Sequence, residues 1–329
     1  MSPAKRARPK VSNAKAAKKN RPKAARAAAR PSPGPGRGRS GANSARGQNR
    51  KAAPAPVAAP TRETRGGGDH DRRPRPKAPR GLGGDQVEGR QAVREMLLAG
   101  TRKIYEVWVA VDQDESVVLD DIAELALSVG VNVRDVSRAK LAGQARTESP
   151  QGVLALAAEL PETDLDDLAR PVEGVAPFLL AVDGVTDPGN LGALLRTAET
   201  AGVNGVVLPR HRAVHVTPTV TKAAAGAIEY LPMALVGGLP AAILRLQGLG
   251  VRVIGLDGSG DSLLFDVNLG DDPVMLVLGA EGKGLSRLVR QRCDEVVAIP
   301  LGGRLGSLNV AAAGALACFE VTRRRQASA

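Results

Sequence analysis

The stretch FLLAVDGVTDPGNLGALLR, residues 178–196, joins an apolar run to a polar turn and then to a helical pattern. The run Phe178–Val182 is wholly apolar, as expected of a short strand that is buried on both faces of a sheet. Pro188 then favours a tight turn, and Asn190 is a good helix cap. The stretch therefore predicts a strand that leads through a polar loop directly into a helix.

The same alternation of strand and helix patterns continues toward the end of the chain. It predicts an α/β domain with a parallel sheet over residues 177–329. Such a sheet binds ligands in the loops beyond the carboxyl ends of its strands. The further predicted strands are 206–208, 251–256, 274–278 and 296–299, and the predicted helices are 191–201, 218–228, 240–249, 285–292 and about 308–325.

A smaller α/β domain is predicted over residues 85–160, because short strand and helix patterns also alternate there. Residues 161–176 follow it and contain a cluster of acidic side chains, so they are interpreted as an interdomain linker. The predicted elements of the small domain are helices over 85–100, 119–129 and 138–145, and strands over 105–111, 131–133 and 153–158.

Residues 1–84 are predicted to form a disordered basic tail. The first 80 residues contain 23 Lys and Arg residues against three acidic ones, a net charge of +20, whereas the whole chain carries +12. A long block of like charge that is rich in Ala, Pro and Gly cannot bury enough apolar surface to fold alone. Its natural partner is a polyanion such as RNA. The alternative is a solubility tail without a specific role.

The composition favours a cytosolic protein without a membrane segment. The Arg-rich start has the composition of an organellar transit peptide, but it is long and has no Leu, Ile or Phe for an amphipathic face. No apolar run approaches the ~20 residues that a membrane span needs. Cys293 and Cys318 lie in apolar helical surroundings, so core packing is expected rather than a disulfide or a nucleophile.

Three loops that follow predicted strands carry polar residues. They are the first loop (183–196), the second loop (LGAEGKGLS, 278–286) and the third loop (IPLGGRLGSLNV, 299–310). The second loop is not a phosphate-binding P-loop, because Val277 stands where that motif needs its first glycine. Its glycine spacing does not fit the dinucleotide fingerprint either. One glycine loop is weak evidence for a cofactor site, but three polar loops on one sheet are much stronger.

These three loops, taken in order, resemble the signature motifs of the SpoU/TrmH-type ribose methyltransferases of the SPOUT superfamily. Residues 190–196, 279–284 and 299–310 match the first, second and third motifs, within a domain from about residue 177 to 325. The small domain resembles the family's RNA-binding domain, which is similar to certain ribosomal proteins. The segments VEGRQAV (87–93) and QGV (151–153) fit its opening and closing patterns. The branch that the chain resembles most is the bacterial guanosine methyltransferases of 23S rRNA.

The resemblance implies an enzyme that transfers a methyl group from S-adenosylmethionine to a ribose 2′-hydroxyl of RNA. It also implies a homodimer, no metal, and a C-terminal segment folded into a deep trefoil knot. True knots are so rare that the sequence pattern alone would have excluded one. By motif match, Gly279, Ile299 and Leu308 would line the cofactor site, with backbone groups for the adenine and two apolar walls. The alternative is that Ile299 and Leu308 are ordinary core residues.

By the same match the catalytic residues would be Arg196, Asn190, Glu281, Ser307 and Asn309. A guanidinium is effectively always protonated, so we interpret Arg196 as a group that orients RNA and stabilises the developing alkoxide, not as a base. Glu281 would accept hydrogen bonds from loop backbone or from Arg196, within one chain or across a dimer. Asn190 and Ser307 could instead serve only as helix caps, and Arg196 could be a surface residue paired with Glu199.

Other interpretations remain open at this point. The same chemistry could act on transfer RNA or on a ribosomal site linked to antibiotic resistance, or the fold could serve a non-catalytic RNA-binding or ribosome-assembly factor. A nucleotide-dependent oxidoreductase is disfavoured because the dinucleotide fingerprint is missing. His211 and His215 stand four residues apart but have no third ligand nearby, so no metal site is expected.

Overall fold

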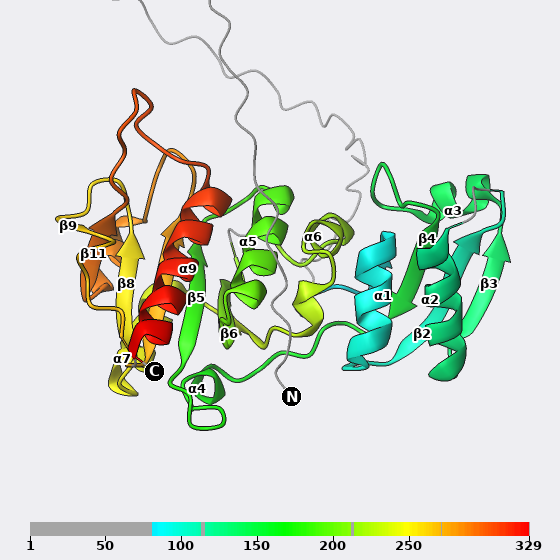
Figure 1. Cartoon of the computed structure of the whole chain (residues 1–329), viewed down its shortest axis with the longest axis horizontal. Helices are drawn as coiled ribbons and strands as arrows, with labels where there is room; N and C mark the ends of the chain where they lie inside the picture. Colours follow the sequence, from blue (N-terminus) through cyan, green and yellow to red (C-terminus); the bar gives the residue numbers. More distant parts are fainter. Residues whose placement is uncertain (1–80, 113–115, 212–213, 271, 329) are drawn as a thin grey trace, which may run out of the picture. The chain divides into compact units, whose positions relative to one another are not determined.

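The structure, a computed structural model, describes residues 81–329 apart from 113–115, 212–213, 271 and 329. Residues 1–80 of the predicted basic tail therefore lie outside the described residues. The last four residues of the predicted tail, 81–84, are ordered instead: Leu82 is buried in a core, and the amide of Gly84 donates to the carbonyl of Val216 at 2.9 Å. Two sheets are formed within the described residues: a four-stranded sheet with the order β1-β4-β2-β3 and a seven-stranded sheet with the order β7-β6-β5-β10-β8-β11-β9 (Figure 1).

The four-stranded sheet is mixed, since β4 pairs antiparallel with β1 and β2, and β2 pairs parallel with β3. Helices α1 and α2 supply buried residues to one core with it, around Val93, Val107 and Ile122. The elements are β1 (Gln86–Glu88), α1 (Arg90–Ala99), β2 (Ile104–Ala110), α2 (Val117–Ser128), β3 (Asn132–Val136), α3 (Arg138–Gln144) and β4 (Val153–Ala157).

The start of this domain differs from the sequence prediction. The predicted helix over 85–100 is in fact a short strand followed by a helix, because Gly89 has a positive φ of 99° and turns the chain between them. Gln86 and Glu88 in that strand are fully buried, although polar side chains of these types are usually exposed. Glu88 is accommodated because it accepts hydrogen bonds from the backbone amides of Arg146 and Thr147.

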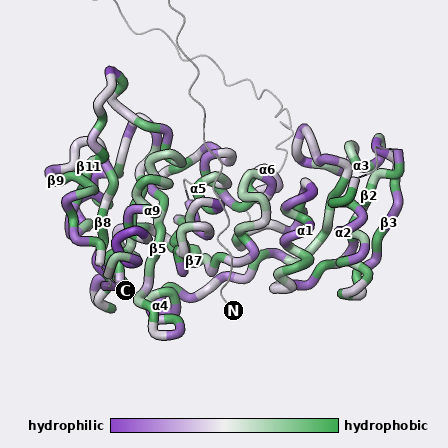
Figure 2. The backbone as a smooth tube through the Cα atoms, viewed as in Figure 1, coloured by the Kyte–Doolittle hydropathy of each residue, from purple (hydrophilic) through white to green (hydrophobic). Residues whose placement is uncertain are grey.

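The seven-stranded sheet is parallel in every pair, as the sequence predicts. Its strands are hydrophobic along most of their length (Figure 2). They are β5 (Phe178–Asp183), β6 (Gly205–Pro209), β7 (Met233–Val236), β8 (Arg252–Leu256), β9 (Ser262–Leu263), β10 (Val274–Gly279) and β11 (Glu295–Ala298). The helices between and after them are α5 (Pro188–Thr200), α6 (Pro218–Ala223), α7 (Leu239–Gly248), α8 (Arg287–Arg292) and α9 (Val310–Ser328).

Both faces of this sheet are covered, which explains why its strands are apolar throughout. Along β5, Phe178, Leu180 and Val182 enter one core with α5 and α9, whereas Leu179 and Ala181 enter a second core with α7 and α8. Side chains of a strand alternate between its faces, so each face receives every second residue. Helices α5 and α9 lie side by side on the first face (Figure 1).

Two elements of this domain were not predicted, and one predicted helix is interrupted. Strand β9 has only two residues, and β7 is a four-residue apolar run that was overlooked. The helix expected over 218–228 ends at Ala223 and is followed by a 3₁₀ turn, η1 (Ala227–Glu229). Gly226 lies between them with φ of 90°, and a Cβ there would lie 2.3 Å from Glu95 of α1. The close approach of α1 therefore requires a glycine in the middle of the predicted helix.

The acidic segment expected to be a linker has contacts of its own. It includes a short helix, α4 (Leu165–Leu168), and Leu168 is buried in the core shared with α7. The amide of Thr163 donates to the carbonyl of Met233 at the sheet edge, 2.8 Å away. Backbone pairing thus ties this segment to β7, which shields part of that edge.

The cysteines behave as the sequence predicts. Both are free thiols; Cys318 lies on α9 and is buried in the first core, and Cys293 packs against the second core. Burial raises the pKa of Cys318 to about 12 and that of Cys293 to about 11, so neither is a thiolate nucleophile at neutral pH. Among the described residues, no helix has the length and apolar character to cross a bilayer.

Candidate functional site

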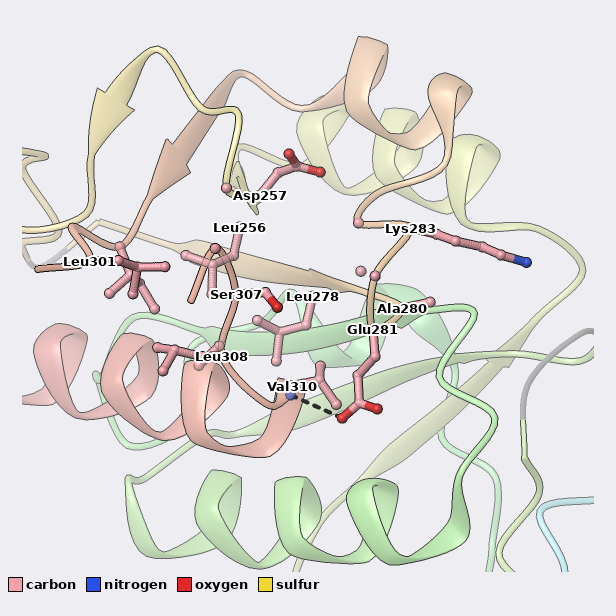
Figure 3. Close-up of a pocket in the computed structure, with 17 residues that line it drawn as sticks. Leu256, Asp257, Leu278, Ala280, Glu281, Lys283, Leu301, Ser307, Leu308 and Val310 are labelled. Atoms are coloured by element: carbon pink, nitrogen blue, oxygen red, sulfur yellow. Dashed lines mark hydrogen bonds between the residues drawn. The ribbon is translucent and has the colours of Figure 1, made fainter. Parts of the chain in front are cut away.

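The three polar loops meet at the carboxyl edge of the seven-stranded sheet. The second and third loops, together with the end of β8, line a cavity of about 300 Å³ close to the point where the strand order reverses, between β5 and β10. The first loop does not line this cavity, but its Asn190 contacts Glu281 of the second loop. Parallel sheets bind their ligands at such a switch point. Leu278 and Leu308 point into the cavity, whereas Lys283 points away from it (Figure 3).

The residues expected to hold the cofactor all line this cavity. Gly279 ends β10 on its wall, Ile299 follows β11, and Leu308 lies in the third loop just before α9. Leu308 is 39% exposed, so it is not an ordinary core residue. Glycine backbone on one side and apolar side chains on the other suit a flat heterocycle with polar edges, and they fit the adenosine part of S-adenosylmethionine.

Glu281 connects all three loops through a single carboxylate oxygen. Its Oε1 accepts from Asn190 Nδ2 of the first loop at 2.9 Å and from Asn309 Nδ2 of the third loop at 2.7 Å. Asn309 Nδ2 also lies 2.9 Å from Asn190 Oδ1, and the amide of Val310 is 3.4 Å from Glu281 Oε1 (Figure 3). The fold therefore joins three side chains that are far apart in the sequence.

Asn190 is not the cap of its helix, contrary to the sequence interpretation. Helix α5 begins earlier, at Pro188, and Asp187 caps it by accepting from the amide of Asn190 at 2.7 Å. An Asp before a Pro is a favourable helix start. Because Asp187 performs the capping, the Asn190 side chain is available to Glu281.

For the last helix, the sequence left open whether Ser307 is only a cap or also serves the site. Asn309 Oδ1 accepts from the amides of Ala311 and Ala312 at 2.9 and 3.3 Å, so Asn309 is the cap of α9. Ser307 lies outside the helix and lines the cavity. Asn309 thus has two roles: its Oδ1 caps α9, and its Nδ2 donates to Glu281 Oε1.

Arg196 stands apart from this cluster. It lies on α5, its residue is exposed, and it does not line the cavity. Within the described residues its side chain makes no hydrogen bond or ion pair, so neither a contact with Glu281 in the same chain nor the alternative pairing with Glu199 is formed. Of the two donors that the sequence left open for Glu281, the loop backbone is the one observed, through the amide of Val310. Its guanidinium is therefore free to meet an incoming group.

The second loop is a compact turn closed by its own backbone. The amide of Ala280 donates to the carbonyl of Gly284 at 3.1 Å, and the amide of Gly284 donates to the carbonyl of Ala280 at 2.9 Å. A Cβ on Gly279 would lie 2.2 Å from the carbonyl carbon of Gly284. The structure therefore gives a reason for glycine at position 279 that motif matching did not supply.

Sequence reasoning missed one side of the cavity. Leu256, Asp257 and Gly258 line it from the end of β8, and Leu301 and Gly306 line it from the third loop. The signal was available, because residues 251–256 were predicted as a strand and Asp257 is the first polar residue beyond its carboxyl end. No family motif marked this position, so it was overlooked.

The described residues contain no group of three His, Cys, Asp or Glu side chains that could hold a metal ion. His211 and His215 are therefore not part of such a group among the described residues. Between them, Arg212 and Ala213 lie outside the described residues.

Two family profiles match separate parts of the chain. The profile of the SpoU rRNA Methylase family matches residues 177–319, which carry all three loops. The profile described as RNA 2′-O ribose methyltransferase substrate binding matches residues 86–163, which contain the four-stranded sheet.

Similar proteins are known in bacteria. The chain is 38% identical over 245 residues to the 23S rRNA (guanosine-2′-O-)-methyltransferase RlmB of Shewanella oneidensis, a match that covers 74% of this chain and 98% of that enzyme. A solved rRNA methyltransferase from Sinorhizobium meliloti with AdoMet bound is 28% identical, with a TM-score of 0.60, and the match covers 72% of this chain and 86% of that one. The SpoU methyltransferase AviRb from Streptomyces viridochromogenes, in complex with AdoMet, is 26% identical, with a TM-score of 0.60 and coverage of 72% and 89%.

Proposed function

This chain belongs to the SpoU rRNA methylase family, and from that premise we propose that it methylates the ribose of a guanosine in 23S rRNA. It is an S-adenosylmethionine-dependent RNA 2′-O-methyltransferase that acts on rRNA. The observation that carries the choice of target is the 98% coverage of the Shewanella oneidensis enzyme at 38% identity, which extends over both domains.

We assign the cofactor to the cavity, with Gly279, Ile299 and Leu308 as its walls. S-adenosylmethionine, when bound, supplies the methyl group and a good leaving group. The protein's tasks are to align the ribose hydroxyl and to stabilise the charge that develops on its oxygen.

We assign these tasks to the side chains around the cavity mouth. Glu281, held by Asn190 and Asn309, fixes the three loops in one arrangement. Ser307 lies on the cavity wall, where its hydroxyl can orient a ligand. Arg196 is the exposed cation, and we infer that it contacts the RNA phosphate and the incipient alkoxide once RNA is bound. If the bound RNA supplies the partner, this explains why the Arg196 side chain has no hydrogen-bond or ion-pair partner among the described residues.

Methylation mapping is the direct test of the target. We expect that deletion of the gene removes 2′-O-methylation from one guanosine of 23S rRNA, and that the wild-type gene restores it. An Arg196→Ala gene, expressed at the same level, is expected not to restore it. Loss of a transfer RNA methylation instead would favour the alternative substrate, and an unchanged methylation map would favour a non-catalytic assembly factor.

We further propose that the enzyme works as a homodimer through α9. This helix leaves two large apolar side chains exposed three residues apart, Leu316 at 44% and Phe319 at 49%. Residues at this spacing share one face of a helix, and paired apolar exposure of this kind is typical of an interaction surface.

The dimer proposal predicts that Phe319→Asp yields a monomer, because the variant would bury an unpaired charge in the interface. Light scattering is expected to give half the wild-type mass for this variant. Leu288→Asp is the matched control, since Leu288 is 53% exposed on α8, and it is expected to remain a dimer. A monomeric wild-type protein would contradict the proposal.

We also propose that the C-terminal segment forms the family's trefoil knot. The order β5-β10-β8 supports this, because β10 lies between strands that precede it in the chain. The third loop then returns to the same edge before α9 covers the face already occupied by α5.

The basic tail, which lies outside the described residues, is proposed to be an electrostatic contact with RNA because of its net charge of +20. An rRNA target and two free thiols support a cytoplasmic location.

A further inference from the structure

Two aspartates flank the strand that leads into the second loop. Strand β10 lies between β5 and β8 in the sheet, with Gly279 in register with Asp183 and Leu278 in register with Leu256. Asp183 is the last residue of β5, and Asp257 follows the last residue of β8. A carboxylate therefore stands on each side of the point where β10 becomes the second loop.

The two carboxylates accept hydrogen bonds from consecutive backbone amides on the far side of that loop. The amide of Leu285 donates to Asp257 Oδ2 at 3.0 Å, and the amide of Ser286 donates to Asp183 Oδ2 at 2.6 Å. Bonds from an amide to an ionised carboxylate are stronger than bonds between neutral groups. The end of the loop is thus anchored to both neighbouring strands.

The packing around Asp257 leaves little room for the loop to move. A Cβ on Gly284 would lie 2.2 Å from Asp257 Oδ2, so only glycine allows this approach, and Gly284 also has a positive φ of 62°. The other oxygen, Oδ1, accepts from the amide of Ser259 at 2.9 Å and lies 3.2 Å from Arg290 Nη1. Both oxygens of Asp257 are therefore engaged by the protein itself.

This engagement distinguishes Asp257 from a ligand-binding carboxylate, although it lines the cavity. Burial acts to raise the pKa of Asp257, but the hydrogen bonds from Ser259 and Leu285 and the charge of Arg290 outweigh it and hold that pKa below its usual value. The carboxylate is therefore ionised at neutral pH, so both of its oxygens can accept from donors and the bonds are charge-assisted. Asp183 does not line the cavity, so any effect it has on the cofactor must be transmitted by the loop.

We propose that Asp183 and Asp257 are positioning residues that hold the second loop in its cofactor-binding shape before the cofactor arrives. The inference rests on the proposed cofactor site and adds two residues that no motif marks. Its physical basis is preorganisation: a loop that is already ordered loses less conformational entropy when a ligand binds.

The test compares Asp257→Ala and Asp183→Ala with the wild type in calorimetric titrations with S-adenosylmethionine. Each variant is expected to weaken binding about 10- to 100-fold, the usual effect of losing a hydrogen bond to a charged group. Asp257→Asn retains one acceptor oxygen and is expected to lose less than Asp257→Ala. The matched control is Asp261→Asn, an exposed aspartate four residues from Asp257, which is expected to bind normally.

Two further readouts separate positioning from general stability. In Asp183→Ala, the single-turnover rate at saturating cofactor and the affinity for RNA are expected to remain within about twofold of wild type, because Asp183 does not line the cavity. In the cofactor-free wild-type protein, the amides of Leu285 and Ser286 are expected to exchange slowly with deuterium by NMR. This measurement does not depend on whether any variant folds.

Wild-type cofactor affinity in both alanine variants would overturn the inference, as would fast exchange of the two amides in the cofactor-free protein. An equal loss of RNA affinity and cofactor affinity would also overturn it, because it would indicate a purely structural role. If the wild-type protein itself does not bind S-adenosylmethionine, the proposed cofactor site fails, and that outcome is distinct from failure of the anchors alone.

Discussion

Replacement of Arg196 by Ala is expected to lower the single-turnover methylation rate by at least about 100- to 1000-fold, the typical effect of removing one preorganised donor to a developing oxyanion. The measurement uses saturating RNA and cofactor, so weaker binding does not contribute. The Arg196 side chain is exposed and makes no hydrogen bond or ion pair with any described residue, so its loss is expected to leave the fold intact.

Arg196→Lys refines this prediction. Lysine keeps the positive charge but loses the planar fork that contacts a phosphate through two hydrogen bonds. The variant is expected to bind S-adenosylmethionine normally and to methylate slowly. Arg170→Ala is the control, because Arg170 is an exposed arginine outside the cavity, paired with Asp167 at 2.8 Å. A loss of less than about threefold for Arg196→Ala would rule out the assigned role.

Gly279→Ala is expected to weaken S-adenosylmethionine binding by roughly 10- to 100-fold, which corresponds to the ~1–3 kcal/mol that overpacking usually costs. The added methyl group would lie 2.2 to 2.5 Å from the backbone of Gly284 and Leu285 and would force the second loop open. Gly279→Val adds two further methyl groups and is expected to abolish binding. Calorimetric titration measures both variants.

The control for this prediction is Gly302→Ala in the third loop. A Cβ there has no atom within 4 Å and its backbone is not left-handed, so near-normal affinity is expected. The thermal midpoint of each variant shows whether the fold persists. Wild-type affinity in folded Gly279→Ala would mean that the second loop tolerates opening or does not bind the cofactor.

Much of the large domain could be predicted from its sequence. Runs such as Phe178–Val182 are apolar throughout because two layers of helices cover the sheet. Burial on both faces can therefore be recognised from the residue types of a strand. Strand β9, with only two residues, has no such pattern, whereas the apolar run of β7 is present but short. Gly226 interrupts a predicted helix because Glu95 of α1, which is far away in the sequence, packs closely against it.

Some features of the candidate site could also be predicted from the sequence, and others could not. Motifs identified Gly279, Ile299 and Leu308, and all three line the cavity. The interpretation of Asn190 as a helix cap was wrong, since Asp187 caps α5. The open alternative that Ser307 caps the last helix is also not realised, since Asn309 caps α9. Several polar residues at a helix start can each serve as the cap, and the surrounding hydrogen bonds select one.

By itself, the sequence determined the alternation of strands and helices, the parallel sheet and the three loops that carry polar residues, because these depend on local residue pattern. Only the tertiary structure decided that Glu281 would meet Asn190 and Asn309, and that Asp183 and Asp257 would hold adjacent amides. The physical reason is the strand order: β10 lies between β5 and β8, and hydrogen bonds between strands and cores on both faces fix that order together.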